Sequence, residues 1–122
     1  AGVCHFTRCS ALELAPYGIR VNTVSPGAVP TAIFPKKLGI AERHHPAAVE
    51  RLVDVFGDYI PLGRAGRAED IADAVMMFAS DASGFITGQD LVVDGGLTVG
   101  LSASGKRAQG EAIRSALAPF LE

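Results

Sequence analysis

A chain of 122 residues with a formal net charge of −2 and 20% charged residues fits one domain with a single hydrophobic core. No basic cluster suggests a nucleic-acid partner, and no apolar run approaches the roughly 18 residues that would span a bilayer. Cys4 and Cys9 point in different directions on a helix and do not suggest a disulfide scaffold, so we expect a reducing, cytoplasmic compartment.

The chain begins in what reads as the middle of a helix. Four residues of the first fourteen recur at helical spacing: Val3, Phe6, Ser10 and Leu14. No capping residue precedes Ala1, and the sequence Pro-Tyr-Gly at 16–18 ends the pattern. Residues 19–24 alternate and are rich in β-branched side chains, which predicts a strand. Because the first turn of the helix is missing, we expect a fragment of a longer protein.

An uncharged, proline-containing loop follows the predicted strand. Residues 25–34 read SPGAVPTAIF, in which Pro26 and Pro30 stiffen the backbone and Gly27 permits a close approach. Thr31 adds a hydroxyl that can donate or accept a hydrogen bond. In open parallel sheets, ligands bind beyond the carboxyl ends of the strands, so this loop is a candidate binding loop. A stiff turn that only redirects the chain is the alternative.

Two helices are predicted after this loop. Residues 46–56 begin with Pro46, which suits a first helical position. The apolar stripe of this helix comprises Val49, Leu52, Val53 and Phe56. A second helix shows the full helical period, with apolar positions Ile71, Ala74, Val75, Phe78 and Ala79. Within it, Met76 and Met77 are expected to fill the core. His44 and His45 are adjacent, so their side chains point apart, and we predict no metal site.

A second predicted strand, residues 89–94, carries an apolar run without polar alternation, which is typical of a sheet covered on both faces. Two strands joined through a helix predict parallel pairing and an α/β architecture. The chain would then supply the last two strands, with their crossover helix, of a doubly wound parallel sheet. Two strands cannot close such a sheet, so we expect the fold to be incomplete on its own.

Three segments resemble the C-terminal half of a classical short-chain dehydrogenase/reductase. They read APYGIRVNTVSPGAVPT, PLGRAGRAEDIADAVMMFAS and ITGQDLVVDGG, and they occur in the order and spacing of that family. The resemblance covers about residues 1–97 and implies a Rossmann-like fold. It also implies an oxidoreductase that uses NAD or NADP to interconvert a secondary alcohol and a ketone.

The resemblance assigns roles to individual positions. The cofactor-binding residues would be Pro26, Gly27, Val29 and Thr31. The Val29 backbone would pair with the nicotinamide carboxamide, and Thr31 would hydrogen-bond the carboxamide or the pyrophosphate. Residues 32–60 would form a mobile substrate lid, lined by Ile33, Phe34 and Leu38. The run Asp94-Gly95-Gly96 would end the last strand of the family, mainly as a structural position.

The family's reactive residues do not occur in these 122 positions. The glycine fingerprint, the catalytic Ser and the Tyr-x-x-x-Lys pair are missing, and we expect them upstream of Ala1. Tyr17 and Tyr59 lack a lysine at the required spacing, so no catalytic residue is assigned. The 122-residue segment alone is therefore predicted to be inactive.

Residues 98–122 depart from the family, because many members end soon after the two glycines. An amphipathic helix is plausible there, with apolar positions Ile113, Ala116, Leu117 and Phe120. Such a helix suits packing or subunit contact more than chemistry. For the complete protein the resemblance implies a homo-oligomer, a dimer or tetramer, acting on a small alcohol or ketone.

Two alternatives remain open at the level of the sequence. The chain could be a truncated, non-catalytic interaction module, for which a true translation start directly upstream of Ala1 in the gene would be evidence. Among enzymes, a 3-oxoacyl-carrier-protein reductase competes with a small-alcohol dehydrogenase. The apolar residues of the lid suit many ketones and do not separate these two.

Overall fold

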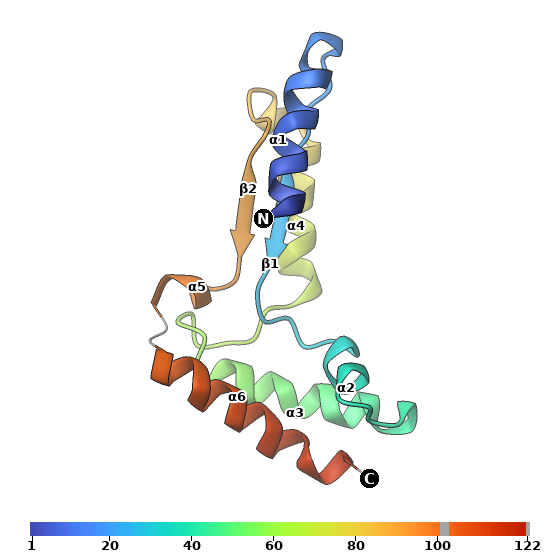
Figure 1. Cartoon of the computed structure of the whole chain (residues 1–122), viewed down its shortest axis with the longest axis vertical. Coiled ribbons are helices and arrows are strands. Elements are labelled where there is room, and N and C mark those ends of the chain that lie inside the picture. The colour runs from blue at the N-terminus through green and yellow to red at the C-terminus, as the bar shows by residue number, and fades with distance from the viewer. Residues whose placement is uncertain (101–102, 122) are drawn as a thin grey trace. The chain divides into compact units, whose positions relative to one another are not determined.

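The computed structural model describes residues 1–100 and 103–121, and Figure 1 labels the helices and strands. The chain forms two compact units. The first consists of Ala1–Pro26 and Ala68–Val93, and the second consists of Gly27–Arg67 and Asp94–Glu122. Each unit therefore contains two separate stretches of the sequence, and the chain passes between the units at the end of each strand.

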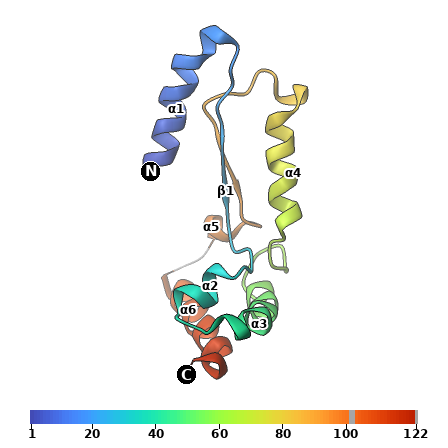
Figure 2. The same ribbon diagram turned by 90° about the vertical axis from the view of Figure 1, so that its right-hand side faces the viewer.

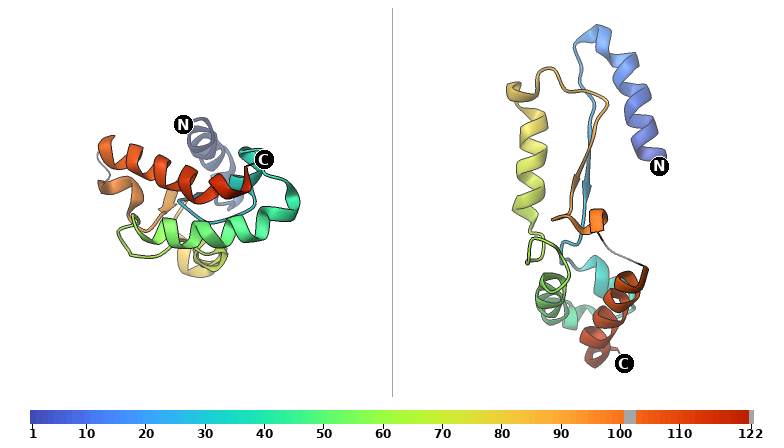
Figure 3. Two further views of the ribbon diagram at one scale, coloured as in Figure 1. Left: turned by 90° about the horizontal axis from the view of Figure 1, so that it is seen from below. Right: turned by 90° about the vertical axis from the view of Figure 1, so that its left-hand side faces the viewer.

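The first unit is a parallel pair of strands with a helix on each face. β1 (Thr23–Pro26) pairs with β2 (Asp90–Val93), with Thr23 opposite Asp90 and Pro26 opposite Val93. Helices α1 (Gly2–Leu14) and α4 (Ala68–Ala79) cover opposite faces of the pair, as Figures 2 and 3 show from two sides. The predicted parallel pairing is confirmed. Short 3₁₀ turns follow the two helices at Ala15–Tyr17 and Asp81–Ser83.

The first strand begins later than the predicted range of 19–24, because its partner turns away before residue 90. Gly88 has a φ of +72°, which interrupts an extended ladder. Val21 is instead held by this turn: its carbonyl accepts from the Gly88 N–H at 2.7 Å, and its N–H donates to the Thr87 hydroxyl at 3.0 Å. Regular pairing therefore starts only at Thr23.

The face of α1 that meets the sheet consists of small residues and differs from the positions that indicated the helix. Thr7 and Ala11 are buried, and the hydroxyl oxygens of Thr7 and Thr23 lie 2.6 Å apart. Val3 and Phe6, two of the residues that recur at helical spacing, are mostly exposed. Helical spacing predicts that a stripe exists, but it does not say which face of the helix meets the sheet.

The outer face of α4 also differs from expectation. Met76 and Met77 are exposed, so the prediction that they fill the core is wrong for this structure. Val75 is exposed as well, whereas Ile71 and Phe78 of the same predicted stripe are half-buried. The helix contacts both strands along one narrow face, which leaves the neighbouring positions without a covering element among the described residues.

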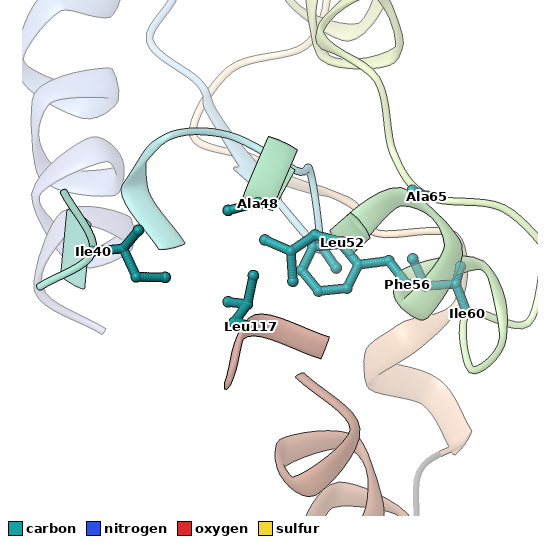
Figure 4. Close-up of a cluster of buried hydrophobic side chains, with 8 residues drawn as sticks. Ile40, Ala48, Leu52, Phe56, Ile60, Ala65 and Leu117 are labelled. Carbon is teal, nitrogen blue, oxygen red and sulfur yellow. The ribbon is translucent and has the colours of Figure 1, made fainter. Parts of the chain in front are cut away.

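The second unit is helical and contains the main apolar core. Its helices are α2 (Ile33–Lys37), η2 (Glu42–His44), α3 (His45–Gly57), α5 (Leu97–Gly100), α6 (Ala103–Leu117) and η4 (Ala118–Phe120). Helices α3 and α6 pack side by side (Figures 1 and 3). The buried cluster of this unit, most of which Figure 4 labels, comprises Ala28, Ile40, Ala48, Leu52, Phe56, Ile60, Ala65 and Leu117.

The buried face of α3 follows a spacing of four residues. Ala48, Leu52 and Phe56 are fully buried, and Pro46 lies in the first turn as predicted. Val53, which the predicted stripe included, is 47% exposed. The observed range, His45–Gly57, extends the predicted helix by one residue at each end. Within the described residues, no helix combines the length and the apolar character needed to cross a bilayer.

Replacing Leu52 with alanine should strongly destabilise the second unit. Its side chain is 0% exposed, so truncation leaves a cavity that costs about 2–5 kcal/mol. Val53→Ala at the next, exposed position should change the free energy of unfolding by no more than about 0.5 kcal/mol. Urea denaturation of a protein that carries the chain measures both. Equal losses for the two variants would contradict the assignment of the buried face.

Candidate functional site

The loop after β1 is shaped by two tight turns. The Val29 N–H donates to the Gly27 carbonyl at 3.0 Å, which is an inverse γ-turn because Ala28 between them has no positive φ. The Thr31 carbonyl then accepts from the Phe34 N–H at 3.2 Å, at the start of α2. The Val29 side chain is half-buried, whereas Thr31 is exposed. Pro26 lies just before this loop, as the last residue of β1.

Gly27 lies in close contact with the backbone that follows β2. A Cβ added to Gly27 would overlap the Cβ of Asp94 and lie only 2.6 Å from its Cα. No side chain fits there without a backbone shift, so this position requires glycine. The close approach that the sequence predicts at Gly27 is, in this structure, an approach to Asp94. The loops that follow the two strands are thereby held together.

A third segment, the turn between α3 and α4, connects the same two loops. The Gly66 N–H donates to the Ala28 carbonyl at 3.1 Å, and the Leu62 N–H donates to the Gly95 carbonyl at 3.2 Å. The sequence pattern alone did not predict this role of the turn. The glycines of the turn were the available signal, since a Cβ at Gly66 would lie 3.2 Å from the Ala28 carbonyl oxygen.

The glycines after Asp94 also permit close packing. Gly95 and Gly96 have φ values of +63° and +88°, which side-chain-bearing residues rarely adopt. A Cβ at Gly95 would lie 2.6 Å from the Ile60 side chain, and one at Gly96 would lie 3.2 Å from that of Pro61. The structural role expected for this run is therefore one of packing. The two glycines allow the backbone after β2 to pack closely against the turn that follows α3.

The Asp94 carboxylate organises the start of α5. Its Oδ1 accepts from the Gly96 N–H and its Oδ2 from the Thr98 N–H, each at 2.8 Å. A hydrogen bond from the Thr98 side chain lowers the pKa of Asp94 most, burial opposes this shift, and the backbone N–H groups lower the pKa further. An ionised Asp94 thus holds the backbone that contacts Gly27.

The three predicted lid residues have different environments. Ile33 is 69% exposed and Leu38 is exposed to a lesser extent. Phe34 instead packs edge-on against Phe56 of α3, with ring centroids 5.1 Å apart and an interplanar angle of 69°. Ile33 and Leu38 are available to line a site, whereas Phe34 anchors the short helix α2 to the core.

Two polar groups of the loop are open to a ligand. Within the described residues, neither the Val29 carbonyl nor the Thr31 hydroxyl forms a hydrogen bond with another protein group. The Val29 N–H is already engaged by Gly27, so Val29 offers an acceptor and no donor. Thr31 offers a hydroxyl that can act as either. The loop can therefore bind a flat amide through one acceptor and one donor.

Other candidate side chains do not form a reactive centre. Tyr17 is exposed. The Tyr59 hydroxyl is buried, and among the described residues it makes no hydrogen bond of ordinary geometry. Burial raises the pKa of Tyr59, and the nearby Gln109 side chain of α6 partly offsets the effect. No group of three or more His, Cys, Asp or Glu side chains within residues 1–100 and 103–121 is arranged to hold a metal ion.

Gly27→Ala should destabilise the contact between the loops. The added Cβ overlaps Asp94, and overpacking of this kind costs about 1–3 kcal/mol. Gly110→Ala is the matched control, because nothing lies within 4 Å of that position in α6 and alanine favours a helix. Denaturant unfolding of both variants compares them. A Gly27→Ala variant as stable as the parent would show that the two loops do not meet this closely.

Asp94→Asn should remove a pH-dependent part of the stability. Because the folded-state pKa is lowered, the ionised carboxylate stabilises the fold above the unfolded value of 3.8, and this contribution disappears as the pH falls through the folded value. At pH 7 the variant should lose about 0.3–1 kcal/mol, as for a carboxylate near a helix start. Unfolding at pH 7 and at pH 3 measures the difference. A loss of the same size at both pH values would contradict this role for the charge.

Comparison with known proteins identifies the family. A family model described as enoyl-(acyl carrier protein) reductase matches residues 1–98. The 3beta-hydroxysteroid dehydrogenase 1 of Eggerthella lenta is 44% identical over 99 residues, which are 81% of this chain and 34% of that protein. The chain thus spans about a third of the length of this curated relative.

Solved structures give the same result. A short-chain type dehydrogenase/reductase from Mycobacterium marinum matches with a TM-score of 0.59 at 41% identity, over 80% of this chain and 34% of that one. A short-chain dehydrogenase from Leptospira borgpetersenii, solved with bound NAD+, matches with a TM-score of 0.59 at 34% identity, over 80% of this chain and 33% of that one. Since the family model covers most of the sequence, the chain belongs to the short-chain dehydrogenase/reductase family.

Proposed function

We propose that this chain supplies the nicotinamide-side loop and the substrate lid of an NAD(P)-dependent oxidoreductase that interconverts a secondary alcohol and a ketone. The observation that carries the proposal is the loop after β1. It leaves the carboxyl end of a parallel strand, where such sheets bind ligands, and it presents the Val29 carbonyl and the Thr31 hydroxyl. Membership of the short-chain dehydrogenase/reductase family supports the same reading.

The hydrogen-bonding groups of the loop match those of a nicotinamide carboxamide. The carboxamide carries an NH₂ donor and a carbonyl acceptor. In the proposal its NH₂ donates to the Val29 carbonyl, because the Val29 N–H is bound to Gly27. The Thr31 hydroxyl donates to the carboxamide oxygen or to a pyrophosphate oxygen. When bound, the cofactor supplies or accepts the hydride.

Rigidity of the loop favours cofactor binding. Gly27 is fixed against Asp94 and the Ala28 carbonyl is held by Gly66, so the backbone before Val29 has partners within the protein, and after Val29 the Thr31 carbonyl accepts from the Phe34 N–H. A preorganised loop loses less conformational entropy when it binds. In the proposal this chain orients the cofactor, while the proton donor and the phosphate-binding turn come from polypeptide outside residues 1–122. Residues 1–122 alone are then inactive.

The substrate is a small-molecule secondary alcohol or ketone in this proposal. Exposed apolar side chains at Ile33 and Leu38 suit an apolar substrate. One relative is a 3-oxoacyl-[acyl-carrier-protein] reductase of Thermotoga maritima and another is a hydroxysteroid dehydrogenase, so both acyl and ring ketones remain candidates. Assembly as a homo-oligomer in the cytoplasm belongs to the same proposal.

Thr31→Ala should weaken binding of the nicotinamide cofactor without changing the fold. Loss of one hydrogen bond to a neutral group costs about 0.5–1.5 kcal/mol, and loss of one to a charged group costs about 1.5–3 kcal/mol. The dissociation constant should therefore rise by roughly 2- to 100-fold. The exposed hydroxyl contributes little to stability, so the melting temperature without cofactor should barely move. Calorimetric titration of the active enzyme that contains this chain measures the affinity.

Thr23→Ala provides the matched control. The Thr23 hydroxyl lies 2.6 Å from that of Thr7, in the half-buried contact between β1 and α1. Loss of the Thr23 hydroxyl should lower the melting temperature, whereas the dissociation constant of the cofactor should change little. Unchanged cofactor affinity in Thr31→Ala would favour the alternative, in which the loop is a stiff turn that only redirects the chain, and would remove the main support for the proposed function.

A further inference from the structure

The C-terminal helix lies outside the family match yet forms part of the core of the second unit. The family model ends at residue 98, whereas α6 begins at Ala103. Leu117, at the end of α6, is 0% exposed and belongs to the buried cluster of α3. Figure 4 shows its side chain pointing toward Leu52 and Phe56. The match to the family therefore gives no account of a helix that completes this core.

Contacts with the C-terminal segment occur at both ends of α3. Before α3, the His44 ring lies against Phe120 of η4, with centroids 6.1 Å apart. After α3, the side chain of Gln109 approaches the buried Tyr59 phenol closely enough to affect its pKa. Ile113, half-buried between these two positions, packs on the same cluster. The segment that contains α6 and η4 therefore follows the whole length of α3.

The same cluster connects α6 to the predicted substrate lid. Phe34 of α2 packs edge-on against Phe56, and Phe56 shares the buried cluster with Leu117. Helix α3 thus has Phe34 and the lid helix on one part of its surface and α6 on another. A change in the packing of α6 can therefore reach Phe34 through this shared buried cluster.

We propose that α6 is a brace that fixes the conformation of residues 32–60, and that Leu117 is a positioning residue for this segment. That residues 32–60 act as a substrate lid rests on the proposed function. Close-packed interiors transmit small displacements, so loosening Leu117 frees α3 and, with it, Phe34 and α2. The brace thereby limits opening of the lid and favours substrate binding. Contacts of the cofactor loop with Asp94 and Gly66 do not involve Leu117 and stay intact.

Hydrogen exchange tests the brace independently of any activity. In the active enzyme that contains this chain, Leu117→Ala should accelerate exchange of the backbone amides in 45–57 by about tenfold or more, because a buried leucine is lost. Leu121→Ala is the matched control, since Leu121 is 49% exposed just beyond the same helix. Unchanged exchange in Leu117→Ala would overturn the inference. If that variant does not fold, Ile113→Ala makes the same test at a half-buried position.

Steady-state kinetics test the effect on the lid. In Leu117→Ala the KM for the ketone should rise by about threefold or more, while the dissociation constant of the cofactor stays within about twofold. Leu117→Met, which retains most of the buried volume, should restore the KM. Faster exchange with an unchanged KM would overturn the role of the brace in substrate binding. Absence of cofactor binding in the parent enzyme would refute the proposed function, and the exchange result would still decide whether α6 braces α3.

Discussion

The second unit depends on the close approach between Gly27 and Asp94. There is no space for a side chain at Gly27, so the backbones that follow the two parallel strands lie in direct contact. After β2, the Asp94 carboxylate accepts from the N–H groups of Gly96 and Thr98. After β1, the Ala28 carbonyl accepts from the Gly66 N–H. The path of the loop is thus determined by main-chain packing. This packing fixes the backbone that leads to Val29, while the Thr31 side chain stays exposed.

The apolar core of the second unit adds a separate constraint. Helix α3 contributes Leu52 and Phe56, which contact both the short helix that carries Phe34 and the C-terminal helix that carries Leu117. One set of contacts therefore fixes the loop after β1, and a second set fixes the predicted lid. The two sets meet at Ala28, but Val29 and Thr31 do not belong to the buried cluster, so under the proposed function cofactor affinity and substrate affinity should respond largely to different substitutions. A site with this division can vary its lid while it keeps its cofactor loop.

Local patterns predicted the elements well and their partners poorly. Parallel pairing, the helix that begins near Pro46 and the turn at Gly27 follow from periodicity and from backbone chemistry. The start of β1 does not, because it depends on the left-handed backbone of Gly88, a distant residue. Likewise, helical spacing indicated the helix α1 but not the face that meets the sheet, where the small residues Thr7 and Ala11 are buried. The contact between Gly66 and Ala28 was not predicted, because a glycine in the sequence indicates an unusual or closely packed backbone but does not identify the residue that it contacts.

A crystal structure of the active enzyme that contains this chain, with NAD or NADP bound, tests the assignment of the loop most directly. The carboxamide nitrogen should lie within about 3.2 Å of the Val29 carbonyl oxygen, with the Thr31 hydroxyl at a similar distance from a carboxamide or pyrophosphate oxygen. Gly27 should remain in contact with Asp94. A nicotinamide ring bound elsewhere, with residues 27–31 out of contact, would contradict the assignment.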